Sequence, residues 1–310
     1  MLMLLSASLL AQEDKLLRAQ QLLKAKNADE ARLAIDSVIL HPQTSSDFMS
    51  WTVRAYIYAD IYKRTDKYKL HSSLRDSVIS SIKISNSLKP DSSFKEQNRK
   101  LAKNIAYGYY NLGKTLLYDS LNYEASQSAY NNYKDILSWV EPSEVNNKEI
   151  EYYLGVGSLY SDIFNKDNNN TKAGDIAKVA LLKVIEIQPD NAMANIDMGL
   201  MYYNQAANLS RSLEYGADFD QIDIVQENLI KLGKQSFQFM IKVYNKDHNN
   251  LKAIEALFYI YRLLNENAKS DEFKKIGMEK GIKYDTEGSG EKPADGVKKE
   301  NKENQQNKEK

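Results

Sequence analysis

Apolar positions along this chain recur at spacings of three and four residues, which is the period of an amphipathic α-helix. One such run places three apolar side chains on a single helical face: Ala177, Leu181 and Val184. Pro189 then ends the helix, because proline lacks an amide proton and restrains the residue before it. Asp190 and Asn191 follow and suit the cap of a further helix. The pattern predicts two helices joined by a tight turn.

The same features return in a fixed order along the chain. A bulky residue, a glycine and a tyrosine precede the run above, in the form Tyr153-x2-Val156-Gly157-x2-Tyr160. They reappear after it as Met198-Gly199-x2-Tyr202. Helices of any packed bundle carry apolar residues at i, i+3 and i+4. An ordinary bundle does not explain why the small residue, the tyrosine, the alanine and the proline return in the same order.

These residues resemble the tetratricopeptide repeat (TPR), a pair of helices, in a form typical of exported bacterial proteins. The resemblance implies an all-α fold, an alpha-alpha superhelix or TPR solenoid of about six helix pairs. We place the pairs at about 13–46, 48–91, 94–145, 148–190, 191–249 and 250–284, with Leu112-Gly113 beginning the third pair. Gly157 and Gly199 should lie where a neighbouring helix approaches too closely for a side chain. Tyr58, Tyr160, Tyr202 and Tyr261 occupy the family's packing position.

The ends of the chain differ from its middle. Residues 1–11 are mostly apolar and end in a small residue before a polar stretch, which predicts a signal peptide, with an N-terminal helix of the fold as the alternative. The solenoid should then occupy 12–284. An excess near 206–234 either extends two helices or forms a helical insertion. Residues 285–310 contain almost nothing apolar and should form a disordered polar tail.

Composition narrows the class of partner. Lys+Arg and Asp+Glu both number 42, so the formal net charge is +0, and the chain lacks the basic excess of a nucleic-acid binder. Cysteine is absent, which excludes disulfides, thiolate metal sites and thiol nucleophiles. Beyond the first residues no apolar run is long enough to span a bilayer, so we expect no stable membrane insertion.

The sequence contains no arrangement typical of catalysis. The 3 histidines lie far apart, and none has a carboxylate or a second histidine at the spacing of a metal site. A glycine-rich phosphate loop and a nucleophile elbow are absent. We therefore expect a protein that is not an enzyme, without cofactor or metal. An enzyme hidden in 206–234 has no residue in its favour.

In the TPR family the first helices line a concave groove that holds an extended peptide or a partner's helix. Carried over by register, the resemblance implies ten groove residues: Tyr56, Asp60, Tyr110, Lys114, Ser158, Asp162, Tyr203, Asn204, Tyr259 and Arg262. The predicted function is a protein-binding scaffold or adaptor of the bacterial cell envelope, exported to the periplasm or cell surface. The alternative is a structural subunit permanently embedded in a larger envelope complex. The identity of the protein partner is left open.

Overall fold

In the part of the chain that the structure describes, every regular element is a helix. The computed structural model describes residues 14–67, 69–213 and 218–284, and these form two compact units. The first unit contains the residues up to 163 together with 170–189, and the second contains 164–169 and the residues from 190 onward. The expected signal peptide and polar tail lie outside the described residues.

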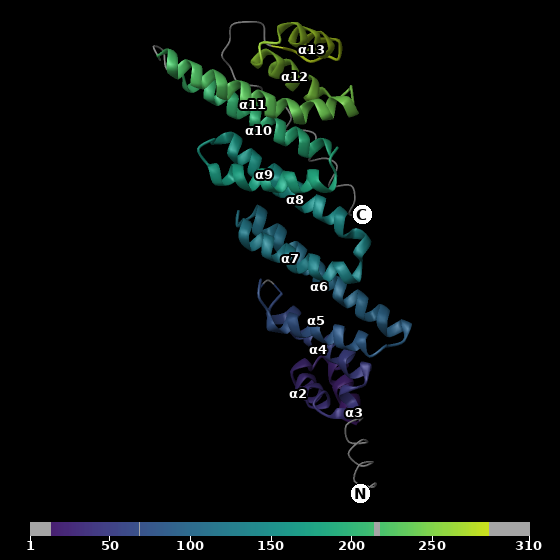
Figure 1. Cartoon of the computed structure of the whole chain (residues 1–310). Helices are drawn as coiled ribbons and strands as arrows, with labels where there is room; N and C mark the ends of the chain where they lie inside the picture. Colours follow the sequence, from purple (N-terminus) through teal and green to yellow (C-terminus); the bar gives the residue numbers. More distant parts are fainter. Residues whose placement is uncertain (1–13, 68, 214–217, 285–310) are drawn as a thin grey trace. The chain divides into compact units, whose positions relative to one another are not determined.

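The first unit is built from four helix pairs and two short connecting helices (Figure 1). A helix over residues 14–24 opens the described chain. The elements that follow are α2 (Ala28–Val38), α3 (Pro42–Ser45), α4 (Phe48–Thr65), α5 (Ser73–Ser87), α6 (Ser92–Tyr118), α7 (Tyr123–Val140), η1 (Pro142–Glu144), α8 (Val145–Lys166) and α9 (Thr171–Ile187). The last three residues of α8 belong to the second unit.

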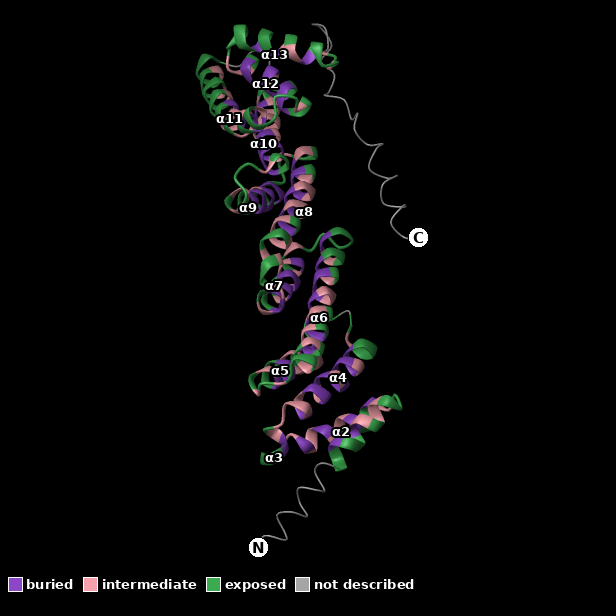
Figure 2. Cartoon of the chain, turned by 90° about the vertical axis from the view of Figure 1, so that its right-hand side faces the viewer, coloured by how far each residue is buried: buried purple, intermediate pink, exposed green. Residues whose placement is uncertain are grey.

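The second unit adds two further pairs, and within each unit the pairs pack in series. Its helices are α10 (Ala192–Ser212), α11 (Phe219–Lys246), α12 (Leu251–Leu263) and α13 (Asn267–Glu279). In the first unit α2 packs on α4 and α5 packs on α6, and in the second α11 packs on α12. Buried residues recur along the longer helices, between intermediate and exposed ones (Figure 2). The predicted fold class, all-α with about six stacked helix pairs, is confirmed.

Asparagine side chains begin several of these helices. Asn191 accepts a hydrogen bond from the backbone N–H of Ala194 at 3.0 Å, as the sequence predicts for this turn. Asn250 accepts one from the backbone N–H of Ala253, also at 3.0 Å. The cap satisfies an amide that has no partner within the helix, and it fixes where each helix begins. The spacing Asn-x2-Ala is therefore a local signal that starts α7, α9, α10 and α12.

Small residues allow the two helices of a pair to cross closely. A Cβ atom on Gly199 of α10 would lie 2.9 Å from Cγ of Met240 of α11. The Ser236 hydroxyl donates to the Gly199 carbonyl oxygen at 2.7 Å at the same crossing. Gly157 likewise faces Leu181, so both glycines lie at the tight contacts that the repeat register predicts.

Two expectations change once the helix ends are known. The first helix of the third pair begins at Ser92, so Leu112-Gly113 lies near the end of α6 instead of at its start. The excess near 206–234 lengthens two existing helices: α10 continues to Ser212, and α11 begins at Phe219. Of the tyrosines expected to pack, Tyr58, Tyr160 and Tyr261 are buried, and Tyr202 is half-buried.

Candidate functional site

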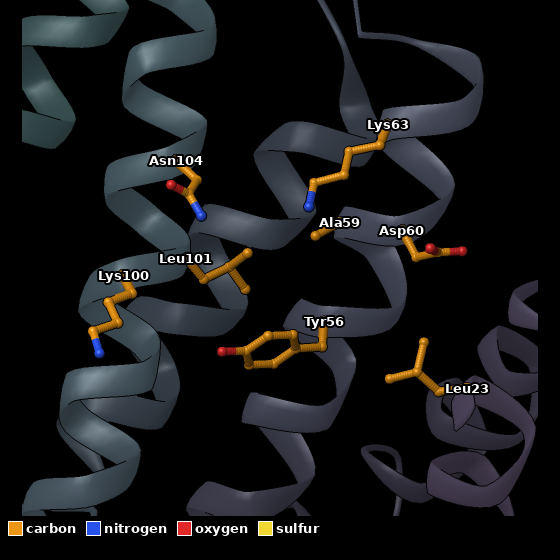
Figure 3. A pocket seen from close by; sticks show the side chains of 8 residues that line it. All are labelled: Leu23, Tyr56, Ala59, Asp60, Lys63, Lys100, Leu101 and Asn104. Atoms are coloured by element: carbon orange, nitrogen blue, oxygen red, sulfur yellow. The ribbon is translucent and has the colours of Figure 1, made fainter. Parts of the chain in front are cut away.

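A pocket of about 290 Å³ lies where the first helices of three successive pairs meet (Figure 3). The helix over 14–24 contributes one lining residue, α4 contributes four and α6 contributes three: Leu23, Tyr56, Ala59, Asp60, Lys63, Lys100, Leu101 and Asn104. All three helices belong to the first unit. The pocket is thus built by the face on which the sequence places a groove.

The floor of the pocket is apolar and buried. Ala59 and Leu101 are only 2% and 4% exposed, since both pack into the helix stack. Tyr56 forms a wall, and its hydroxyl donates to the backbone carbonyl oxygen of Gln97 on α6 at 3.4 Å. Burial raises the pKa of the Tyr56 phenol, so this group stays neutral and remains a hydrogen-bond donor. The floor and wall are therefore held by contacts between helices α4 and α6.

The rim of the pocket carries charged and amide groups. In Figure 3 the Lys63 ammonium and the Asn104 amide point toward the space between α4 and α6, whereas the Asp60 carboxylate points to the other side of α4. Asp60 pairs with Arg64 at 3.2 Å, and Lys100 has a looser contact with Glu96 at 3.9 Å. Among the described residues, no hydrogen bond or ion pair engages the Lys63 ammonium. The rim thus offers a cation and an amide above an apolar floor.

This arrangement can hold a polar group above an apolar one. A lysine, an amide and a phenol can hold a carbonyl or carboxylate oxygen, while the floor receives an apolar side chain. The lining residues contain no histidine, serine or cysteine that would act as a nucleophile or as a base near neutral pH. In the described part of the chain, no group of three or more histidines and carboxylates is placed to hold a metal ion.

The structure brings several of the ten predicted groove residues together in pairs. Tyr56 and Asp60 both line the pocket. The Lys114 ammonium lies 5.9 Å from the centre of the Tyr110 ring. Farther along the chain, the rings of Tyr203 and Tyr259 lie 6.1 Å apart within the second unit. The first helices therefore carry separate clusters, and only Tyr56 and Asp60 belong to the pocket.

Tyr110 contacts another helix more than it contacts solvent. It is 8% exposed, and its hydroxyl donates to Oε1 of Glu151 on α8 at 2.5 Å. Burial, reinforced by this hydrogen bond, raises the pKa of Tyr110. Burial also acts to raise the pKa of Glu151, but hydrogen bonds from Lys148 and Tyr110 outweigh it and leave that pKa lowered. This network joins α6 to α8, so Tyr110 offers a partner little of its surface.

The remaining predicted residues lie on the first helices of the later pairs. Ser158 is half-buried and Asp162 exposed, one turn apart on α8. Asn204 is half-buried on α10, and Arg262 is exposed near the end of α12. Burial raises the pKa of Tyr203, and the positive charge of Arg262 partly opposes this. Arg262 therefore lies close enough for its charge to act on Tyr203.

Three polar residues that α4 and α6 add to the pocket were not among the predicted groove residues: Lys63, Lys100 and Asn104. A signal for two of them exists, because Lys100 and Asn104 have the same i, i+4 spacing as Tyr56 and Asp60. The motif match at Leu112-Gly113 set the register of the third pair on Tyr110 and Lys114, which lie farther along α6 than the pocket residues.

Comparisons with known proteins find a structural likeness but no match by sequence. No protein-family model matches the chain, and no curated protein matches its sequence. Among solved structures the chain is similar to that of PilW, described as a widely conserved type IV pilus biogenesis factor. The match has 13% sequence identity and a TM-score of 0.31, and it covers 86% of this chain and 91% of that one. At this level the likeness carries no argument about partners or process.

None of the helices in the described ranges has both the length and the apolar character needed to cross a bilayer.

Proposed function

We propose that this chain is a non-enzymatic scaffold or adaptor that holds a segment of another protein, an extended peptide or a helix, against its first helices. The pocket among Tyr56, Lys63 and Lys100 is the observation that carries the proposal. A segment lying across this face contacts three helices at once, so its affinity depends on the spacing between repeats. The TPR-like order of residues in the sequence also supports binding of a partner segment on this face.

The lining residues favour a protein segment of mixed character. Leu23 and Leu101 provide apolar contact, while Lys63 and Asn104 provide donors for backbone carbonyl or carboxylate oxygens of the partner. A purely apolar ligand would leave these donors without partners on binding, which costs free energy. We place the protein in the bacterial cell envelope, exported to the periplasm or cell surface, on the strength of the apolar residues 1–11.

Site-specific photo-crosslinking in the source cell tests the proposal. A photoreactive amino acid replaces Lys63, an exposed residue at the pocket, and in a matched control it replaces Leu33, which is 70% exposed on α2. We expect one discrete crosslinked protein from the Lys63 position and none of the same identity from the Leu33 position. The same adducts from both positions, or no adduct at Lys63, would contradict the proposal.

Washing the captured complex separates the scaffold from the embedded subunit. A partner held by lysine contacts at a solvated pocket is released as salt rises, because exposed charges are screened. Stoichiometric recovery through high salt instead favours a permanent subunit, whose interface is larger and more apolar.

A further inference from the structure

The chain turns back on the second unit after α13. The helix ends at Glu279, and Gly281 has a φ of 87°, in the left-handed region that favours glycine. The backbone N–H of Ile282 donates to the Gly277 carbonyl oxygen at 2.8 Å, which closes the turn. The turn directs residues 281–284, which we call the strap, back toward α12.

The strap places two side chains on the core of the second unit. Ile282 and Tyr284 are half-buried and pack against that core, whereas Lys283 between them is exposed. Residues 282–284 have no regular secondary structure, and this alternation of exposure is typical of an extended segment with one face on a surface. The strap is thus a peptide segment already bound to this unit, through an aliphatic residue and an aromatic residue two positions later.

Tyr284 fills a notch that exists because residue 277 is a glycine. A Cβ atom on Gly277 would lie 2.7 Å from Cζ of Tyr284. The ring of Tyr284 lies 4.6 Å from the ring of Phe258 and 6.4 Å from the ring of Tyr259. The Tyr284 hydroxyl donates to the Phe273 carbonyl oxygen at 3.5 Å, which is a long contact. The notch therefore receives an aromatic ring mainly by its shape.

Tyr284 also lies beside a residue of the predicted groove. Tyr259 has Tyr203 of α10 as a ring neighbour at 6.1 Å and Tyr284 as another at 6.4 Å. Tyr203 and Tyr259 are both predicted groove residues, and Tyr284 adds a third ring next to them. A partner segment that lies on α10 and α12 would therefore meet the strap at Tyr259.

We propose that the notch formed by Gly277, Phe258 and Tyr259 is a second peptide-binding site, which the strap closes in the free protein. A partner segment with an aliphatic residue and an aromatic residue two positions later displaces Ile282 and Tyr284 and takes over their contacts. Two half-buried side chains hold the strap, so it opens without unfolding of the helices beneath it. These residues belong to the second unit, so the site is separate from the pocket and is tested independently of it.

Closure by the strap lowers the apparent affinity of a competing segment. A tethered segment acts at an effective concentration on the order of millimolar, so a free peptide binds only those molecules whose notch is open. Removal of the two strap side chains should therefore raise the affinity for a free peptide, although it adds no contact between the peptide and the notch.

Peptide binding to an opened variant provides the test. The probe is a fluorescein-labelled peptide with the sequence of residues 279–284, and a control peptide has Ser in place of its Ile and its Tyr. The opened variant is the full chain with Ile282→Ser and Tyr284→Ser. Fluorescence anisotropy should show that the probe binds the opened variant about tenfold or more tightly than it binds the wild type, and that the control peptide binds neither.

Gly277→Ala in the opened variant is a matched block of the notch. The atoms nearest to the added methyl group belong to the Tyr284 side chain, which the opened variant lacks, and alanine favours the helix, so circular dichroism should show α13 still folded. The methyl group occupies the place of the incoming ring, so probe affinity should fall about tenfold or more. Gly108→Ala, on α6 in the first unit, should leave probe affinity unchanged.

The inference is wrong if the folded opened variant does not bind the probe more tightly than the wild type does, or if Gly277→Ala leaves the affinity of the probe unchanged. A wild-type dimer in sedimentation that Tyr284→Ser dissociates would also overturn it, because the strap would then belong in the notch of a second copy.

Discussion

Gly157 of α8 lies directly against Leu181 of α9: a Cβ atom at Gly157 would stand 2.5 Å from Cδ2 of Leu181 and 2.6 Å from its Cγ. A side chain at this position would force the Leu181 side chain, or the two helices, to shift. The contact joins the first helix of a pair to the second, and Gly199 and Met240 repeat it in the second unit. The position of these glycines in the repeat therefore has a steric cause that the structure makes explicit.

Replacing Gly199 by Leu should destabilise the second unit. The new side chain would overpack against Met240, whose Cγ lies 2.9 Å from the position of a Cβ. Overpacking of this kind costs about 1–3 kcal/mol, and sometimes more. Urea denaturation followed by circular dichroism measures the loss.

A second glycine provides a control of opposite sign. A Cβ atom on Gly108 in α6 would meet the Tyr62 hydroxyl at 3.6 Å, which is an ordinary contact. Gly108→Ala should therefore stabilise the chain by about 0.5–1 kcal/mol, because alanine has the higher helix propensity. If Gly199→Leu left the urea midpoint of unfolding unchanged, the close crossing of α10 and α11 at Gly199 would not exist in solution.

Local sequence signals predicted the repeat, but they did not predict the contacts between neighbouring helix pairs. Asn191 caps its helix through Ala194, three residues away, so a single sequence contains everything needed to anticipate it. Tyr110 is different, because the group that buries and engages it, Glu151, is 41 residues away on another pair. Spacing within a helix shows which residues share a face, but the offset between pairs decides which of them a neighbour covers.

The stacked tyrosines predict a loss of stability at high pH. The rings of Tyr130 and Tyr152 lie 3.9 Å apart and nearly parallel, and burial raises the pKa of both phenols. The folded state thus favours the neutral phenol. Its contribution is complete below about pH 10, the pKa of an unfolded tyrosine, and is lost as the pH rises above that value. Ionisation, followed by absorbance at 295 nm, should coincide with loss of helical circular dichroism.

Tyr130→Phe isolates the ionising group in this experiment. The variant keeps the ring that stacks on Tyr152 but lacks the phenol hydroxyl that ionises at high pH. We expect its alkaline unfolding midpoint to move to higher pH than that of the wild type. An unchanged midpoint would mean that other tyrosines control the transition.

Charge reversal at the pocket should weaken partner capture without changing the fold. Lys63 and Lys100 line the pocket, so Lys63→Glu and Lys100→Glu would oppose acceptor oxygens on the bound segment. Co-purification of the partner identified by crosslinking should fall about tenfold for each variant, and thermal unfolding should not change. Lys95→Glu is the matched control, because Lys95 is exposed on α6 but does not line the pocket. Equal losses in all three variants would point to a general charge effect.

Arg75 is a fully buried cation that donates hydrogen bonds to backbone carbonyl oxygens. Its Nη2 donates to the carbonyl oxygens of Lys69 and Leu70 at 2.6 and 2.7 Å, and its guanidinium carbon lies 3.5 Å from the centre of the Tyr109 ring. The residue therefore fastens the connection between α4 and α5 to α6. Lysine cannot reproduce a planar group that stacks and donates at once. Arg75→Lys should cost about 2 kcal/mol in urea denaturation, since hydrogen bonds from a charged donor are worth about 1.5–3 kcal/mol each.

Arg64 is the matched control for this loss. It is a half-exposed arginine on α4 that pairs with Asp60 at 3.2 Å, and exposed pairs contribute at most about 1 kcal/mol. Arg64→Lys should therefore change the free energy of unfolding only slightly. Limited proteolysis adds a local readout, because release of the connection in Arg75→Lys should expose residues 69–72 to cleavage before the rest of the chain unfolds. If Arg75→Lys and Arg64→Lys lost the same stability and were cut at the same rate, the buried guanidinium would not hold this connection, and the α4–α5 turn would owe its position to apolar packing alone.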